Sequence, residues 1–308
     1  MKVAICVLTY KRPEGLRQLL AGLAQLDFTS GHAPEVHVLV IDNDPESSAS
    51  AICSRLQDGY RWTLRLFHEP RRGISHARNA AIQLTKDTYD FMAFIDDDEV
   101  PDPRWLEALM LVQRTYQVDV VTGPVLPVFG HAAPVWSVKG GFYERSRHPT
   151  GYHMELARTG NVLIHTKVFA RDENRFDPRY ALTGGEDTHF FLRISKQGHQ
   201  IIWADEAVVY ETVPASRMKL GWILQRAYRA GNTYALCERD IQLPTRKLLL
   251  RALKGLARIT IGAILILPAV GMGRVRLYKA LQQISLGAGM VMGLAGRRYE
   301  EYRQTHGT

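Results

Sequence analysis

Short apolar runs alternate, in the first part of the chain, with longer stretches whose apolar residues recur every three or four positions. The runs lie at residues 3–8, 36–41, 63–67, 91–95 and 118–125, and the helical patterns lie between them at 13–26, 46–56, 75–84 and 104–116. Runs that are apolar at every position, as at 3–8 and 91–95, are typical of strands buried on both faces. Their alternation with helices predicts an α/β fold built on a mostly parallel sheet flanked by helices.

Polar residues follow three of these predicted strands at the point where each strand ends. They are Thr9–Arg12 after the first strand, Asp42–Asp44 after the second and Asp96–Glu99 after the fourth. Ligands of parallel sheets bind beyond the carboxyl ends of the strands. We therefore expect the three clusters to converge on one crevice.

The segment Asp96–Glu99 places acidic side chains at four successive positions. Carboxylates this close repel one another, so their placement at a strand end indicates that a cation binds there. Hard divalent ions such as Mg²⁺ or Mn²⁺ bind through oxygen ligands and can carry a diphosphate. The alternative is a solvated acidic turn that caps the helix beginning near Pro101.

The middle of the chain departs from the alternation. Residues 126–158 are rich in Pro, Gly and aromatic residues, and a loop of this length in a compact domain is usually functional or mobile. A strand-like run follows at 161–165. A helix is predicted to open at 183–187 and to run to Lys196, where Gly198 ends it.

The C-terminal part combines basic and apolar residues. An amphipathic helix is predicted over 218–239, and uncharged runs follow at 259–273 and 284–296. Both runs are shorter than the roughly 20 residues that a membrane-spanning helix needs. We expect them to pack against the body or to lie in a membrane interface. The chain thus divides into an α/β domain over 1–215 and a basic helical region over 216–308.

The net charge of +8 is unevenly distributed over the 308 residues. Residues 217–303 contain 16 Lys and Arg against 4 Asp and Glu, which leaves the rest of the chain mildly acidic. Such a segment suggests anionic lipid, pyrophosphate or nucleic acid as its partner, and a solvated basic surface is the alternative. Because three widely spaced cysteines and the absence of an apolar leader favour the cytosol, we expect a cytoplasmic protein.

Seven motifs together resemble those of the glycosyltransferase family 2 enzymes, which have the GT-A fold. They are Thr-Tyr-Lys-Arg-Pro (9–13), Val-Ile-Asp-Asn-Asp (40–44), Gly-Ile-Ser-His-Ala-Arg-Asn (73–79), Phe-Ile-Asp-Asp-Asp-Glu (94–99), Gly-Asn-Val-Leu (160–163), Gly-Gly-Glu-Asp-Thr (184–188) and Gln-Arg-Ala-Tyr-Arg-Ala-Gly (225–231). Each motif is weak alone, but their joint order is specific. The sequence is most similar to the succinoglycan-type exopolysaccharide glucosyltransferases, with which it shares Gly-Pro-Val at 123–125 and Pro-x-Trp at 134–136.

The resemblance implies roles for the residues that bind the nucleotide and the metal. Tyr10 and Asp42 would hold the base, Asp42 by accepting a hydrogen bond, although an Asx turn also explains Asp42. Arg78 would line the nucleotide pocket, against the alternative of an exposed charge early in a helix. Asp98 would ligate the metal that bridges the diphosphate, and Asp96 would contact the ribose or the metal's waters. Because a third carboxylate, Asp97, stands between them, the division of labour stays open.

Further roles concern catalysis and the leaving group. By the resemblance, Asp187 would be the base that deprotonates the acceptor hydroxyl, and Glu186 would orient the acceptor. The alternative is that both are first-turn acids of their helix. Arg226 and Arg229 lie three apart on one helix face and would clamp the leaving diphosphate or a lipid pyrophosphate.

The resemblance therefore implies an inverting, metal-dependent transferase that moves a hexose from a nucleotide diphosphate sugar, UDP-linked, to a hydroxyl of a glycan or lipid-linked saccharide. The Rossmann-like domain would bind the donor, and the basic region would hold the enzyme at the inner face of the cell membrane. One rival is a sugar-1-phosphate nucleotidyltransferase, which needs a Gly-rich phosphate loop that Thr9–Pro13 lacks. The other is a non-enzymatic binder of anionic polymers, although aromatic-interleaved basic motifs for nucleic acid are absent. The sugar and the acceptor are not encoded in any motif we recognise.

Overall fold

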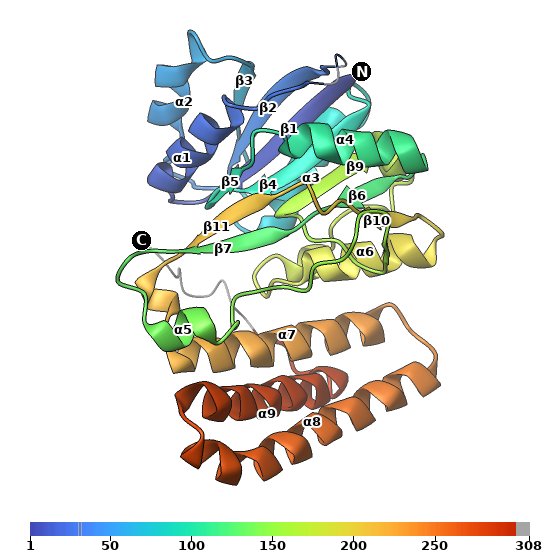
Figure 1. Ribbon diagram of the computed structural model, residues 1–308. Coiled ribbons are helices and arrows are strands. Elements are labelled where there is room, and N and C mark those ends of the chain that lie inside the picture. The colour runs from blue at the N-terminus through green and yellow to red at the C-terminus, as the bar shows by residue number, and fades with distance from the viewer. Residues whose placement is uncertain (30, 32, 300–308) are drawn as a thin grey trace.

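The computed structural model describes residues 1–29, 31 and 33–299 (Figure 1). Its main sheet has eight strands within this part of the chain. In spatial order they are β3 (Thr63–His68), β2 (Glu35–Asp42), β1 (Lys2–Thr9), β4 (Phe91–Asp96), β9 (Asn161–His165), β6 (Val120–Thr122), β10 (Ile201–Trp203) and β8 (His153–Met154). The first four are parallel to one another, β9 is antiparallel to β4 and β6, and β10 is parallel to β6. The predicted mostly parallel α/β sheet is confirmed.

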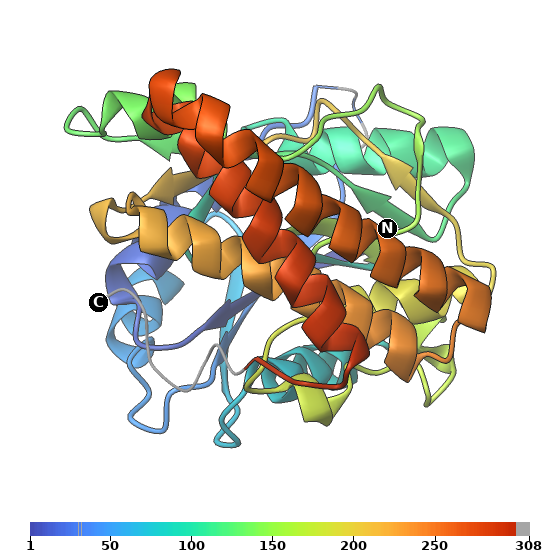
Figure 2. The ribbon, with the colours of Figure 1, turned by 90° about the horizontal axis from the view of Figure 1, so that it is seen from below.

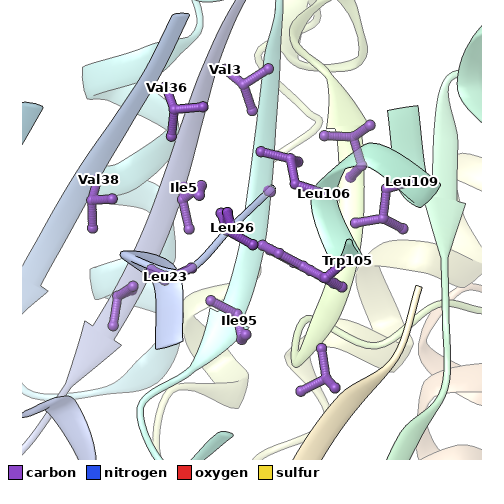
Figure 3. Close-up of a cluster of buried hydrophobic side chains, with 14 of the residues drawn as sticks. Val3, Ile5, Leu23, Leu26, Val36, Val38, Ile95, Trp105, Leu106 and Leu109 are labelled. Carbon is purple, nitrogen blue, oxygen red and sulfur yellow. The ribbon is translucent and has the colours of Figure 1, made fainter. Parts of the chain in front are cut away.

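Helices cover both faces of this sheet because alternate strand residues point to opposite sides. Val3, Ile5 and Val7 of β1 pack on the side of α1 (Pro13–Leu23), α2 (Ser50–Gln57) and α4 (Trp105–Tyr116). Part of this cluster, with Trp105 against Leu26 and Ile95, appears in Figure 3. The intervening Ala4 and Cys6 face α3 (Ile74–Thr85) and α6 (Glu186–Lys196). The continuous apolar runs therefore reflect burial on two sides.

A second, three-stranded sheet crosses the end of the first. It consists of β5 (Glu99–Pro101), β11 (Val209–Val213) and β7 (Val125–Phe129), with β11 in the middle. The single strand expected over 118–125 is therefore wrong, since β6 and β7 belong to different sheets. The break falls at Gly123 and Pro124, because proline has no amide to donate to a strand ladder and Gly123 packs against the carbonyl of Ala207.

The segment 126–158 is only partly irregular. It contains most of β7, the short helix α5 (Val135–Lys139) and β8. Its aromatic residues Phe142 and Tyr143 are buried in a separate cluster with Ile223, and Tyr143 stacks on Trp222 with ring centroids 5.8 Å apart. The segment is therefore fastened to the C-terminal helices. Three 3₁₀ helices complete the connections: η1 (Thr166–Ala170), η2 (Pro178–Tyr180) and η3 (Ala215–Arg217).

Three long helices form a layer below the α/β part (Figures 1 and 2). They are α7 (Leu220–Asp240), α8 (Thr245–Gly271) and α9 (Arg274–Leu294). The amphipathic helix expected over 218–239 is confirmed as α7. The apolar runs at 259–273 and 284–296 belong to longer helices of 27 and 21 residues, since basic residues continue a helix as readily as they flank it. Judged by length and composition alone, α8 is long enough and apolar enough to cross a membrane. The boundary predicted at 215/216 falls within η3 and stays a prediction.

Candidate active site

A cavity of about 320 Å³ lies at the carboxyl ends of β1, β2 and β4. Its lining includes Thr9–Arg12 from the end of β1, Asn43 from the end of β2 and Asp96–Glu99 from the end of β4. The three polar clusters converge as predicted, although only Asn43 of the second cluster lines the cavity. Residues from far along the sequence complete the lining, among them Glu211 of β11 and Arg226 and Arg229 of α7.

We define the acidic cluster as Asp96, Asp98, Glu99 and Glu211, four carboxylates that line this cavity. Glu99 and Glu211 are direct neighbours on the paired strands β5 and β11. Gly160 makes room for the cluster, because a Cβ there would lie 2.7 Å from Glu99 Oε1 and 3.1 Å from Asp96 Oδ2. A side chain at Gly160 would therefore displace the carboxylates.

Crowding makes these acids weaker than usual. Partial desolvation inside the cavity raises the pKa of Asp96 to about 6, and the charges of Asp98 and Glu211 add to the rise, while Arg78 opposes it. The pKa of Glu99 is raised well above its ordinary value, by burial first and then by Asp96 and Glu211. The cluster carries negative charge that the protein itself compensates only in part, as a cation-binding site requires.

The middle aspartate of the Asp96–Asp98 run is the most buried of the three. Asp97 is buried, and it accepts hydrogen bonds from the Thr9 hydroxyl at 2.8 Å and from Arg12 Nη1 at 3.1 Å. Burial raises the pKa of Asp97 to about 7, and Arg12 opposes the rise. Arg12 Nη1 thus bridges Asp97 and Asp98, at 3.1 and 3.0 Å, and the outer pair, Asp96 and Asp98, is the more exposed.

The outer pair fits a hard divalent cation only in part. Asp98 pairs with Arg12 Nη1 at 3.0 Å and with Arg217 Nη2 at 3.4 Å, and the side chain of Asp96 is 47% exposed. Within the described residues, no set of three or more His, Cys, Asp or Glu side chains is arranged to hold a metal. Mg²⁺ is often bound by one or two carboxylates together with substrate phosphates and water. The oxygen ligands present suit that arrangement, in which the donor completes the coordination.

Beside these carboxylates lies the arginine cluster, which we define as Arg145, Arg217, Arg226 and Arg229, all lining the cavity. Arg217 and Arg226 lie over the Trp222 ring, 5.8 and 5.2 Å from its centroid, so this indole positions both guanidinium groups. Burial lowers the pKa of Arg226 to about 10, and the nearby charge of Arg145 lowers it further. Burying several guanidinium groups beside one another costs free energy, through desolvation and through repulsion between like charges. A cluster of this kind indicates a polyanionic ligand.

Sequence reasoning identified Arg226 and Arg229 but missed Arg145, Arg217 and Glu211. Glu211 connects the two clusters, because it pairs with Arg217 at 2.6 Å and with Arg145 at 3.8 Å. Arg145 lies in the long middle segment, and Arg217 lies in a single turn of 3₁₀ helix. Neither place has a hydrophobic period from which its orientation could be read, and no motif marks them.

The two acids at the start of α6 have different surroundings. Asp187 accepts a hydrogen bond from the Thr188 amide at 2.6 Å. The charge of Arg145, and then burial, lower the pKa of Arg158 to about 10, and the negative charge of Asp187 opposes this shift. Asp187 and Arg145 therefore both lie near Arg158, which places Asp187 close to the arginine cluster. Glu186 is buried and pairs with Arg78. Neither acid is part of the cavity lining as the structure has it.

Gly185 explains how α6 begins beside α7. Its φ of +88° is unfavourable for other residues, and a Cβ there would collide with the Thr233 side chain of α7. The absence of a side chain at Gly185 therefore lets α7 pack closely against the start of α6.

Arg78 is buried, so the alternative of an exposed charge early in a helix is wrong. Its guanidinium pairs with Glu186 and lies 3.9 Å from Asp96 Oδ1. Arg78 therefore links the acidic cluster to the start of α6. It is not among the residues that line the cavity, and its contact with a nucleotide stays a prediction.

The residues predicted to hold the base lie at the ends of the paired strands β1 and β2, but of the two only Tyr10 lines the cavity. Tyr10 lines the cavity, with Arg72 5.5 Å from its ring centroid. Asp42 is fully buried, and its two carboxylate oxygens accept hydrogen bonds from the amides of Asp44 and Ala49, as in the Asx-turn alternative. Its neighbour Asn43 faces the cavity instead and fastens the Gly73 loop through a 2.8 Å hydrogen bond. The contact of Asp42 with a base stays a prediction.

Comparison with known proteins decides the family. The family model described as glycosyl transferase family 2 matches residues 4–174, which is more than half of the chain. The chain belongs to glycosyltransferase family 2. The succinoglycan biosynthesis protein ExoM of Rhizobium meliloti (strain 1021) is 36% identical over 237 residues, covering 76% of this chain and 74% of that protein. The glycosyltransferase AglE of Haloferax volcanii is 22% identical over 229 residues, covering 74% of this chain and 71% of AglE.

Solved structures confirm the GT-A fold of this family 2 enzyme. The mannosyltransferase PcManGT from Pyrobaculum calidifontis, in complex with GDP-Man and Mn²⁺, superposes with a TM-score of 0.66 at 18% identity, covering 96% of this chain and 88% of that one. S. aureus TarS 1–349 in complex with UDP superposes with a TM-score of 0.53 at 17% identity, covering 92% and 90%. At identities this low, the comparison supports a shared fold and does not assign a role to any residue of the present enzyme.

Proposed function

We propose that this glycosyltransferase moves a hexose from a UDP-linked sugar to a hydroxyl of a growing glycan, with inversion at the anomeric carbon and with a divalent metal. The placing of an acidic and an arginine cluster on one cavity carries the proposal. A nucleotide diphosphate sugar bound with a metal presents both charges, since its phosphates suit the arginines and its cation suits the carboxylates.

The donor would lie across the ends of β1, β2 and β4. Tyr10 offers an aromatic face for the base, and Asp42 and Arg78 are the further nucleotide contacts that the family motifs imply. Asp98 and Asp96 would supply carboxylate oxygens to Mg²⁺ or Mn²⁺ beside the diphosphate. When bound, such an ion neutralises the phosphates and makes the diphosphate a better leaving group.

Transfer requires that the acceptor hydroxyl lose its proton while it attacks the anomeric carbon. Asp187 would accept this proton as general base, and Glu186, held by Arg78, would help to orient the acceptor. Arg226 and Arg229 would bind the departing diphosphate as its negative charge develops. One base and no second nucleophile among these residues imply a single displacement, and hence inversion.

The acceptor would be a saccharide on the path to an exopolysaccharide, as the likeness to ExoM suggests. The chain lacks the Gln-x-x-Arg-Trp signature of processive members of the family at residues 225–231. We therefore propose that one sugar is added per binding event. A lipid-linked acceptor would place the enzyme in the cytoplasm, peripherally at the inner face of the cell membrane.

A nucleotide-sugar screen tests the proposal. The purified enzyme is incubated with UDP- and GDP-linked hexoses, with Mn²⁺ or with a chelator, and nucleotide release is measured with and without an oligosaccharide acceptor. We expect UDP release that depends on the metal and rises with the acceptor, and NMR should show the inverted linkage in the product. Retention of configuration, or full activity in the chelator, would contradict the proposal.

A further inference from the structure

The outer face of α8 is apolar along the whole helix. Its large side chains there are between about half and four-fifths exposed, and they lie on the side away from α9. They are Leu249, Leu250, Leu253, Leu256, Ile261, Ile264, Leu267 and Val270. Leu267 is the most exposed of them, at 83%. An apolar patch of this extent on a protein surface indicates a partner.

The opposite side of α8 is fastened to the protein through small residues. Gly255, Gly262 and Ala269, spaced seven apart, are its buried positions. Gly255 meets the carbonyl of Gly287 in α9, and α9 in turn contacts the α7 backbone through Gly289. The three helices therefore form one layer with α8 outermost, as Figures 1 and 2 both show.

The charges around this face are of one sign. The sequence from Ile241 to Tyr299 contains no Asp or Glu. Arg246, Lys247 and Lys254 are exposed in the first half of α8, and Arg274, Arg276 and Lys279 are exposed at the start of α9. None of these six forms a salt bridge with another residue of the described part of the chain. The 15 residues between Arg258 and Arg274 carry no charge at all.

We infer that the outer face of α8 lies on an anionic membrane surface, parallel to it, with the C-terminal half of α8 and its turn into α9 immersed more deeply than the first half. Apolar side chains supply burial in the acyl region, and the flanking Lys and Arg meet anionic headgroups. The inference deepens the peripheral location proposed above, and it does not depend on which sugar or acceptor is used.

A second copy of the chain suits this face less well. A symmetric dimer through α8 would bring two basic, acid-free segments together without any countercharge. A membrane-spanning α8 is also disfavoured by the packing. Since α8 is joined along its length to α9 and through it to α7, spanning would draw the charged residues of α7 toward the hydrocarbon, at a high cost.

The structure also narrows the earlier expectation that both apolar runs, within residues 244–303, dock on the membrane. The run at 284–296 contributes Gly287, Gly289, Met290 and Gly293 to the buried contacts of α9. Its small residues are used between helices, so α8 alone presents the apolar surface. Residues 300–303 lie outside the described part of the chain.

Vesicle co-sedimentation of the full chain tests the inference, with phosphatidylcholine vesicles made with or without phosphatidylglycerol. We expect binding to the anionic vesicles at low salt, weaker binding in high salt, and release by alkaline carbonate. Leu267→Glu should lower the affinity about tenfold or more, as expected for one large apolar side chain removed from burial. Leu111→Glu makes the same exchange at a site on α4 that is 55% exposed, and it should bind like the wild type.

Several results would overturn the inference. They are a wild-type chain that stays in the supernatant, a Leu267→Glu variant that binds undiminished, and retention in carbonate, which indicates spanning. A dimer that Leu267→Glu dissociates, without vesicle binding, would assign the face to a second copy.

A polarity-sensitive dye attached to Leu267→Cys or to Leu249→Cys tests the depth of the two halves of α8. On vesicles, the emission of the dye at position 267 should shift further to the blue than that of the dye at position 249. The opposite order would refute the deeper immersion of the C-terminal half. UDP release by Leu267→Glu in solution should match the wild type, so a failure of docking is separable from a failure of the proposed chemistry.

Discussion

The acidic cluster is built mainly at strand ends, whereas the arginine cluster comes from α7, a 3₁₀ turn and a long connecting segment. Asp96 is the last residue of β4 and Asp98 lies in the turn after it, so the backbone of the sheet determines where they lie. Arg145 and Arg217 depend instead on tertiary packing around Trp222 and Tyr143. One side of the cavity is thus fixed by local structure, and the other by how the C-terminal helices dock against the α/β part.

Removal of a carboxylate from the acidic cluster should have the largest effect. We expect Asp98→Ala to abolish activity and metal-dependent nucleotide binding while the fold is retained, because the metal would lose one of the two carboxylates proposed to bind it. Isothermal titration with UDP and Mn²⁺, together with circular dichroism, measures both properties. Unchanged UDP affinity in the presence of Mn²⁺ would remove Asp98 from the metal site. It would also contradict the assignment of the metal to the acidic cluster and of the phosphates to the arginine cluster.

Loss of the base should come next. Asp187→Asn should still bind the donor but should lose transfer by about 10²-fold or more, the scale of general base catalysis. Steady-state kinetics and donor titration separate the two effects. Near-normal turnover would leave Asp187 as a first-turn acid of α6, bonded only to Thr188.

The packed side of α6 should respond to pH. His189 is buried and stacks on Tyr180, and burial lowers the pKa of His189 to about 4. Since the unfolded chain takes up this proton near pH 6.5 and the folded chain resists it, stability is lost as the pH falls from 6.5 toward 4. Between pH 7 and pH 5 the loss should be about 2 kcal/mol.

Urea unfolding of the wild type and of His189→Phe at the two pH values isolates this contribution, because other titrating groups are common to both proteins. The variant should show a smaller loss of stability between pH 7 and pH 5. An equal loss in both proteins would mean that His189 does not titrate as stated.

Neutralising one member of the arginine cluster should have the smallest effect, because its neighbours remain. Arg226→Gln should lower kcat/KM about tenfold, the value of one charge-assisted hydrogen bond to the diphosphate. Arg239→Gln serves as the control, since Arg239 lies on the same helix and bonds the carbonyl of Leu294. If both variants lose activity equally, the effect on activity comes from the net charge of α7, and a specific contact between Arg226 and the diphosphate is contradicted.

The sequence was informative where chemistry follows local order. Strand ends bring Thr9–Arg12, Asn43 and Asp96–Asp98 together because parallel strands align their carboxyl ends, so this half of the cavity was predictable. The burial of Asp97 was not, because adjacent carboxylates look alike in sequence until the Thr9 hydroxyl is seen to bind Asp97, while Arg12 binds both Asp97 and Asp98.

The other half of the cavity could not be read in the same way. Glu211 reaches the cavity only because β11 pairs with β5, and Arg217 only because η3 ends beside Trp222. These are long-range contacts that leave no period in the sequence. The length of α8 was missed for a different reason, since flanking charges were taken as boundaries when they lie inside the helix.

The burial of Asp97 has an evolutionary consequence. Asp97 is buried and accepts hydrogen bonds from Thr9 and from the partly exposed Arg12, whose guanidinium it holds against the end of β1. A sequence with a small residue in place of Asp97 would leave Arg12 without its inner partner, so positions 12 and 97 should vary together among relatives. Asp98 also pairs with Arg12, so position 98 should vary with position 12 as well, whereas Asp96 pairs with Arg78 and position 96 should vary independently of position 12.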